Sequence, residues 1–291
     1  MNYMNFPNYF ADAESDFNNA QFVIFGVPYD KTSSFRPGAI QGPKKIRESS
    51  WNFETYNIRN SVDLRDINFH DYGDLDVKDD TPQKMIEKVK KFTSMLLSQK
   101  KFPIALGGEH SITPGIIQAF PKDIAVLCLD AHIDFRNQYE NENLNHACVI
   151  RRISDHIDIG NIAVLGIRSA EKQEFEDAHK KGLFYVDSFA IKEKGIKNTL
   201  IETKKHLGAK LIYFTLDIDV VDPSYAPGTS TPEPFGISPL DVLECIRFFS
   251  SNIIGFDIVE VCPPFDSGQS SLLAAKFVRL LIEEVWSKNK R

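Results

Sequence analysis

The chain of 291 residues has no long hydrophobic run, few cysteines and no excess of basic residues. No apolar stretch approaches the roughly 20 residues that cross a bilayer, so we expect no membrane-spanning segment. Residues 1–16 are polar and acidic without a basic start, which is not typical of a signal peptide. Lys and Arg number 34 against 40 Asp and Glu, for a formal charge of −6. This balance disfavours nucleic acid or a membrane surface as a partner.

The four cysteines, Cys128, Cys148, Cys245 and Cys262, form no C-x-x-C pair, and three of them lie in apolar stretches. This pattern predicts reduced, buried thiols in a cytoplasmic protein rather than a disulfide framework. The chain also lacks linkers, internal repeats and low-complexity blocks. Hydrophobic residues are 42% and charged residues 25%, as in ordinary globular proteins. We therefore expect a single domain over residues 1–291.

Short apolar runs alternate with helical patterns along the whole chain. The predicted strands are Gln21–Gly26, Asn68–Tyr72, Phe102–Leu106, Ile124–Leu129, Asn161–Gly166, Leu183–Val186, Leu211–Leu216 and Ile253–Ile258. The predicted helices begin at Thr81–Pro82 and lie near Ser111–Ala119, Ala170–Lys180, Ile196–His206, Pro239–Phe249 and Ser270–Trp286. Most strands are continuously apolar, which is typical of strands covered on both faces. The pattern predicts an α/β fold, a three-layer α/β/α sandwich around a mostly parallel eight-stranded sheet.

Polar clusters follow four of the predicted strands. They are G-G-E-H-S at 107–111, D-A-H-I-D at 130–134, D-I-D at 217–219, and Glu260. Ligands of parallel α/β sheets bind at the carboxyl ends of the strands, so we expect these segments to converge on one site. Asp222, before Pro223, is interpreted as a structural residue that orients the loop after the third cluster.

Three of these clusters supply six side chains of types that commonly bind metals. They are His110, Asp130, His132, Asp134, Asp217 and Asp219. Alternate side chains of an extended backbone face the same side, so the members of each motif can share a cavity. Four carboxylates are too much charge to bury without cations, and six ligands suit two divalent ions. The oxygen-rich ligand set favours Mn²⁺ over zinc. A single D-x-D is more often a turn or a helix cap, but three motifs on three strands favour a two-metal hydrolase.

Together these motifs resemble those of the ureohydrolases, the arginase/agmatinase family of binuclear manganese enzymes. The resemblance also includes R-P-G at 36–38, G-P at 42–43, T-L-D-I-D-V-V-D-P at 215–223, A-P-G-T at 226–229 and E-V-C-P-P-F-D at 260–266. It covers nearly the whole chain and implies the arginase/deacetylase-like fold.

The resemblance implies two Mn²⁺ ions per subunit, with Ni²⁺ or Co²⁺ as substitutes. One ion would be held by His110, Asp130, Asp134 and Asp217. The other would be held by Asp130, His132, Asp217 and Asp219, so that Asp130 and Asp217 bridge. His146 matches the proton-shuttling histidine of the family, and Glu260 matches the glutamate that pairs with the substrate guanidinium; both are predicted catalytic and substrate-binding residues.

Residues 135–153 are similar to those of archaeal-type agmatinases and depart from the arginase pattern, most plainly at Ala147. The predicted reaction is hydrolysis of agmatine to putrescine and urea, a step of polyamine biosynthesis. Guanidinobutyrate, arginine or guanidine remain alternative substrates, because Arg136 could recruit a carboxylate. A salt bridge from Arg136 to Glu140 or Glu142 is the simpler interpretation. Relatives form trimers or hexamers, so a homo-oligomer is expected.

Three rival classes are less well supported by the sequence. A two-metal phosphoesterase would need basic residues beside the clusters. A deacetylase centre needs one Asp-His-Asp set and would not use Asp219 together with His110. A non-catalytic metal-binding scaffold finds no support, because all six proposed ligands are present.

Overall fold

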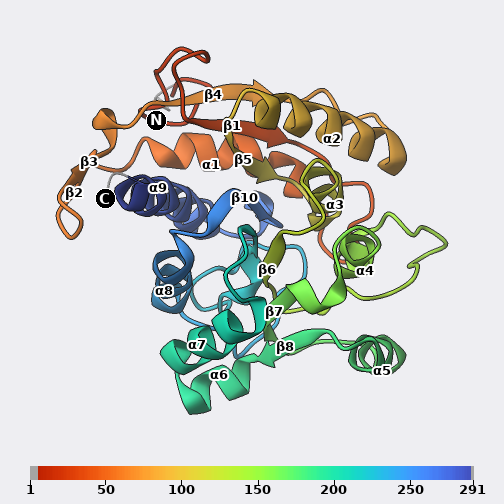
Figure 1. Cartoon of the computed structure of the whole chain (residues 1–291). Coiled ribbons are helices and arrows are strands. Elements are labelled where there is room, and N and C mark those ends of the chain that lie inside the picture. Colours follow the sequence, from red (N-terminus) through yellow and green to blue (C-terminus); the bar gives the residue numbers. More distant parts are fainter. Residues whose placement is uncertain (1–5, 290–291) are drawn as a thin grey trace.

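The computed structural model describes residues 6–289 and contains a central sheet of eight strands (Figure 1). These strands are β1 (Phe22–Val27), β4 (Phe69–Asp74), β5 (Phe102–Gly107), β6 (Ala125–Leu129), β7 (Ile162–Ile167), β8 (Phe184–Asp187), β9 (Ile212–Asp217) and β10 (Ile253–Val259). Their order in the sheet is β4-β1-β5-β10-β9-β6-β7-β8. All neighbouring pairs run parallel, which confirms the predicted sheet.

Helices cover both faces of the sheet, as predicted. One face carries α1 (Gly42–Ser50), α6 (Ser188–Lys194), α7 (Ile196–Leu207), α8 (Pro239–Phe249) and α9 (Gln269–Asn289). The other carries α2 (Pro82–Ser98), α3 (Thr113–Ile117), α4 (Val149–Ser154) and α5 (Lys172–Lys181). Alternate residues of a strand enter the two cores, so Phe22 packs on the first side and Val23 on the second.

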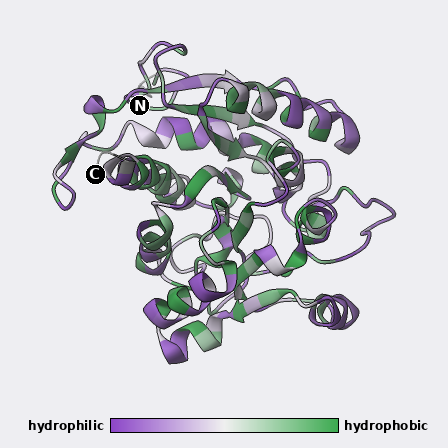
Figure 2. Cartoon of the chain, viewed as in Figure 1, coloured by the Kyte–Doolittle hydropathy of each residue, from purple (hydrophilic) through white to green (hydrophobic). Residues whose placement is uncertain are grey.

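Burial on both faces explains the continuous apolar runs. All six residues of β1, β7 and β9 are buried. At the sheet edge β4 buries only Phe69 fully, and its sequence is correspondingly polar. The covering helices mix hydrophilic and hydrophobic residues (Figure 2), because each buries only a stripe.

Three helices and one hairpin of the described residues were not predicted from the sequence. Helix α1 begins at Gly42–Pro43 and has few apolar residues, while α4 and α6 have six and seven residues. Such short segments show too few turns for a 3.6-residue period to be recognised. The hairpin of β2 (Tyr56–Asn57) and β3 (Val62–Asp63) is antiparallel and outside the main sheet.

The four cysteines are buried and free, as predicted. Among residues 6–289, no helix combines the length and the apolar character needed to cross a membrane. The predicted single domain also includes residues 1–5 and 290–291, which lie outside the described residues.

Candidate metal centre

The six proposed metal ligands lie at the carboxyl ends of β5, β6 and β9, close to the centre of the sheet. His110 begins the short 3₁₀ helix η3 (His110–Ile112), and the Asp130–Asp134 segment directly follows β6. Asp217 ends β9, and its side chain accepts a hydrogen bond from the backbone N–H of Asp219, which caps η6 (Ile218–Val220). Parallel strand ends thus bring residues from distant segments together.

Three carboxylates surround the ring of His110. Its Nδ1 lies 3.1 Å from Asp130 Oδ2, 3.4 Å from Asp134 Oδ2 and 3.5 Å from Asp217 Oδ2. His110 and Asp130 are almost completely buried. These four residues are the predicted set of the first ion.

A second cluster adjoins the first through Asp130. His132 Nδ1 lies 2.9 Å from Asp219 Oδ2 and 3.6 Å from Asp130 Oδ1. Asp130 therefore turns one oxygen toward each histidine, the arrangement expected of a bridging carboxylate. Asp217 turns Oδ2 toward His110, while its Oδ1 accepts from the backbone N–H of Asp219, just as Oδ1 of Asp130 accepts from that of His132.

Hydrogen bonds behind His110 leave Nδ1 free to bind a metal. His110 Nε2 lies 3.0 Å from Thr215 Oγ1, and that hydroxyl donates to the buried Asp257 at 2.5 Å. Because Thr215 donates its only proton to Asp257, it accepts from Nε2, so the lone pair of the neutral ring, the form that binds a metal, is on Nδ1. Nδ1 is buried and, among residues 6–289, has close carboxylate neighbours but no hydrogen-bond partner. A lone pair facing three carboxylates fits a divalent cation.

The pKa values of the clustered aspartates and of His110 also indicate an excess of negative charge. Burial, followed by the charge of Asp130, raises the pKa of Asp134 to about 7. Burial, Asp219 and Asp130 raise the pKa of Asp217 well above its ordinary value. Burial alone would lower the pKa of His110, but the neighbouring Asp130 and Asp134 hold it well above its ordinary value. Without cations, the cluster therefore retains protons.

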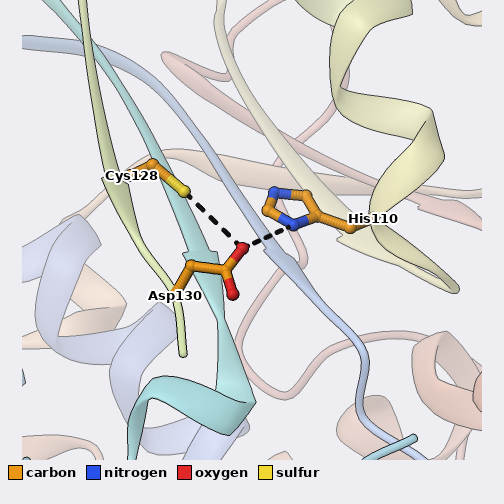
Figure 3. Close-up of side chains that lie close together, drawn as sticks. All are labelled: His110, Cys128 and Asp130. Carbon is orange, nitrogen blue, oxygen red and sulfur yellow. Dashed lines mark hydrogen bonds and ion pairs between the residues drawn. The ribbon is translucent and has the colours of Figure 1, made fainter. Parts of the chain in front are cut away.

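Figure 3 shows that the thiol of Cys128 points toward Asp130 beside His110. The Sγ atom lies 4.0 Å from Asp130 Oδ2, and burial raises the pKa of Cys128 to about 12. The form of cysteine that binds metals is the thiolate. Without metal, Cys128 therefore keeps its proton and is a weak hydrogen-bond donor to Asp130.

Glu260 lies above the cluster at the end of β10. Its Oε1 accepts from the backbone N–H of His110 at 2.6 Å, and its Oε2 accepts from Ser230 Oγ. Burial raises the pKa of Glu260 to about 8. Glu260 has a φ of +61° and Asp134 a φ of +47°, both in the left-handed region. Such strained residues cluster at functional sites, where the surrounding structure holds them in place.

His146 lies on the wall of the same cavity. The cavity has a volume of about 190 Å³, and His110, His132, Asp134, His146, Asp217, Asp219 and Glu260 all line it. Asp130 lies beneath them, fully buried. Burial, followed by the charge of His132, lowers the pKa of His146 to about 4. The eight predicted site residues thus surround one small, strongly acidic cavity.

Comparison with known proteins decides the family. The sequence model of the protein family described as "Arginase family" matches residues 20–283. The chain belongs to the arginase family. It is 38% identical over 280 residues to an agmatinase of Halalkalibacterium halodurans, with 94% of this chain and 95% of that protein covered. The crystal structure of agmatine ureohydrolase of Thermoplasma volcanium is 38% identical, with a TM-score of 0.93 and coverage of 99% of this chain and 97% of that one. Human mitochondrial guanidino acid hydrolase is 35% identical over 266 residues, 88% of this chain and 76% of that protein.

The predicted salt bridge from Arg136 to Glu140 or Glu142 is wrong, because Arg136 pairs with Glu174 instead. Its Nε lies 3.3 Å from Glu174 Oε2, and its guanidinium stacks on the ring of Tyr139 at 4.7 Å. Glu174 belongs to α5 and lies 38 residues from Arg136 in the sequence, so this pairing could not be predicted from local spacing. Arg136 lines the outer cavity with its charge already compensated.

Arg168 supports the part of the cavity wall that contains Thr231 and Glu233. Its guanidinium donates to the backbone carbonyls of Gly166, Asp219, Val220, Glu233 and Pro234. The cavity-lining segment that contains Thr231 and Glu233 is thereby tied to the backbone of Asp219.

Sequence reasoning missed the polar residues that support the site. Thr32 and Ser34 contact the His146 ring, and both follow the carboxyl end of β1. The rule that ligands gather at strand ends would have found this loop had it been applied to the first strand. Glu109 lies in the G-G-E-H-S motif at 107–111, but nothing in the sequence separates its role from that of His110.

Proposed function

We propose that the chain is an agmatinase, which hydrolyses the guanidinium group of agmatine to putrescine and urea with two bound divalent ions. The observation that carries this proposal is the cluster of four carboxylates and two imidazoles at the floor of the cavity, a cluster that contains no Lys or Arg. Membership of the arginase family and the similarity to agmatinases over nearly the whole chain support the same reaction.

The residues present fit two ions. His110, Asp130, Asp134 and Asp217 would hold one, and Asp130, His132, Asp217 and Asp219 the other. The position of Asp130 between the two histidines supports its bridging role, and bridging by Asp217 is part of the proposal. When bound, such ions supply Lewis acidity that makes water a nucleophile near neutral pH.

The charge of the cavity selects the substrate. Its carboxylates disfavour anions such as phosphate esters and favour a cationic guanidinium. Glu260, held in place by His110 N–H and Ser230 Oγ, is the carboxylate that pairs with the guanidinium. Arg136 is compensated by Glu174, so it adds no free positive charge to repel the far amine of agmatine.

His146 moves the proton. The departing amine nitrogen must gain a proton as the C–N bond breaks, and an imidazole on the cavity wall can deliver it. Because burial lowers the pKa of His146, the ring is neutral at rest and ready to accept a proton from solvent or from the attacking water.

The remaining features of the proposal concern the cellular protein. We assign Mn²⁺ as the metal because oxygen ligands predominate, with Ni²⁺ or Co²⁺ as substitutes. We also assign a single-domain subunit, a homo-oligomeric state of trimer or hexamer, a cytoplasmic location and a place in polyamine biosynthesis. Light scattering coupled to size-exclusion chromatography tests the assembly.

A urea-release assay tests the reaction. Metal-free protein is reconstituted with Mn²⁺, Ni²⁺ or Co²⁺ and supplied in turn with agmatine, guanidinobutyrate, arginine and guanidine. We expect the highest kcat/KM with agmatine and Mn²⁺. The similarity to human guanidino acid hydrolase makes guanidinobutyrate the second candidate. A preference for that acid would show that Arg136 binds the carboxylate, and full activity without metal would refute the mechanism.

A further inference from the structure

A chain of hydrogen bonds leads from the buried Glu109 to the ring of His146. Glu109 has no exposed surface. Its Oε2 accepts from the backbone N–H of Thr32 at 2.7 Å, and its Oε1 accepts from Thr32 Oγ1 at 2.7 Å and from Ser111 Oγ at 2.5 Å. Thr32 Oγ1 in turn lies 3.0 Å from the backbone N and 3.2 Å from Nδ1 of His146.

We propose that Glu109, acting through the Thr32 hydroxyl, selects the tautomer of His146 that carries its proton on Nδ1 and leaves Nε2 free for proton transfer. The inference rests on the proposed function, in which His146 moves a proton. Glu109 is a positioning residue in this scheme, because it touches neither substrate nor metal.

The argument counts protons on the Thr32 hydroxyl. A hydroxyl has one proton to donate and two lone pairs to accept with. Both oxygens of Glu109 accept hydrogen bonds, from the Thr32 N–H and from Ser111 Oγ as well as from Thr32 Oγ1, so the Thr32 proton goes to Glu109. The backbone N–H of His146 can only donate, so it occupies one lone pair of Thr32. The second lone pair faces Nδ1, which must therefore carry a proton.

The opposite ring nitrogen is then available for chemistry. Nε2 of His146 lies 3.3 Å from Ser34 Oγ, an exposed hydroxyl that can either donate or accept. Tyr139 packs edge-on against the ring at 6.0 Å between centroids and limits its rotation. A ring fixed at Nδ1 and open at Nε2 has the arrangement of a general base held by an orienting carboxylate.

Glu109→Gln tests the inference because it reverses the direction of the chain. The Thr32 backbone N–H needs an acceptor, so the amide oxygen takes that place and the NH₂ group faces Thr32 Oγ1. The hydroxyl then accepts from glutamine and donates to Nδ1, which moves the ring proton to Nε2. We expect kcat for agmatine to fall by about 100-fold, with KM and bound metal within about twofold of wild type.

Two further substitutions separate positioning from simple structural support. Ser111→Ala removes the other hydroxyl from Glu109 without touching His146, and we expect it to retain kcat. Thr32→Ser keeps the hydroxyl and should retain kcat, whereas Thr32→Val should lose it as Glu109→Gln does. Equal losses in Ser111→Ala and Glu109→Gln, or equal activity of the two Thr32 variants, would overturn the proposal. The Thr32 pair decides the matter if Glu109→Gln fails to fold.

The tautomer has a readout independent of activity. Histidine-selective ¹⁵N NMR of the full chain without added metal, with the signals assigned by comparison with His146→Ala, distinguishes protonated from bare ring nitrogens. We expect a protonated Nδ1 in wild type and a protonated Nε2 in Glu109→Gln. A wild type with this tautomer but no urea release refutes the proposed function alone. An active wild type with a protonated Nε2 refutes the inference alone.

Discussion

Replacing Asp217 with asparagine should stabilise the metal-free protein while weakening its response to metal. Asparagine keeps the oxygen that accepts from the backbone N–H of Asp219 and cannot take on the buried charge that Asp217 gains when it ionises. Asp217 Oδ2 and Asp130 Oδ2 lie 3.5 and 3.1 Å from the same atom, His110 Nδ1. The two oxygens are therefore within about 7 Å of each other, where like charges repel by about 2.5 kcal/mol at an effective dielectric constant near 20.

Protonated His110 offsets part of this repulsion, so we expect a net gain of about 1 kcal/mol in the free energy of unfolding. For a domain of this size, the gain corresponds to about 2–4 °C in Tm. The sign also depends on pH. Because the pKa of Asp217 is raised in the folded state, its contribution to wild-type stability is complete below about pH 4 and is lost as pH rises through the raised value. The advantage of Asp217→Asn should therefore grow between pH 5 and pH 8.

Metal should reverse the order of stability. At a thousandfold excess over Kd, an ion that binds only the folded state adds about 4 kcal/mol, or roughly 10 °C. Differential scanning calorimetry with EDTA and then with Mn²⁺ measures both effects, and elemental analysis gives the bound metal. Asp123→Asn, at an exposed aspartate, is the matched control. A metal-free Asp217→Asn that melts below wild type would refute the repulsion argument, and an undiminished Mn²⁺ shift would remove Asp217 from the ligand set.

Three other substitutions have distinct expected outcomes. His146→Ala should retain both metals by elemental analysis and lower kcat in the urea assay by about 10²–10⁴-fold; normal turnover would assign the proton to another group. Arg168→Lys cannot reach all five backbone carbonyls and should lose about 1–3 kcal/mol in urea unfolding, whereas unchanged stability would show that the wall holds without them. Gly108→Ala would place Cβ 1.9 Å from the carbonyl oxygen of Tyr29 and should lose about 3 kcal/mol or more; a wild-type unfolding curve would contradict this contact.

The sheet could be predicted because its strands are buried on both faces. All eight predicted strands are present, with ends shifted by at most two residues, since a continuous apolar run such as that of β9 has few alternatives. The short helices α1, α4 and α6 could not be predicted, because their stability comes from packing rather than from a repeating pattern.

The parts of the site differ in the same way. Histidine and aspartate at strand ends are visible in the sequence, so the six proposed metal ligands could be predicted from their positions, whereas the roles of His146 and Glu260 rest on the family resemblance. The contact of Arg136 with Glu174 spans 38 residues and depends on where α5 packs. The chain from Glu109 to His146 depends on the conformation of the loop after β1, and no spacing rule encodes it.

The central position of β10 has a consequence for synthesis on the ribosome. The strand lies between β5 and β9, yet it is made after every other strand of the sheet. A growing chain that ends before residue 253 cannot join its first strands to the rest, and it lacks Glu260. Folding of the sheet must therefore await the last part of translation. Metal binding in the finished cavity is consequently a late event, which follows synthesis of nearly the entire polypeptide.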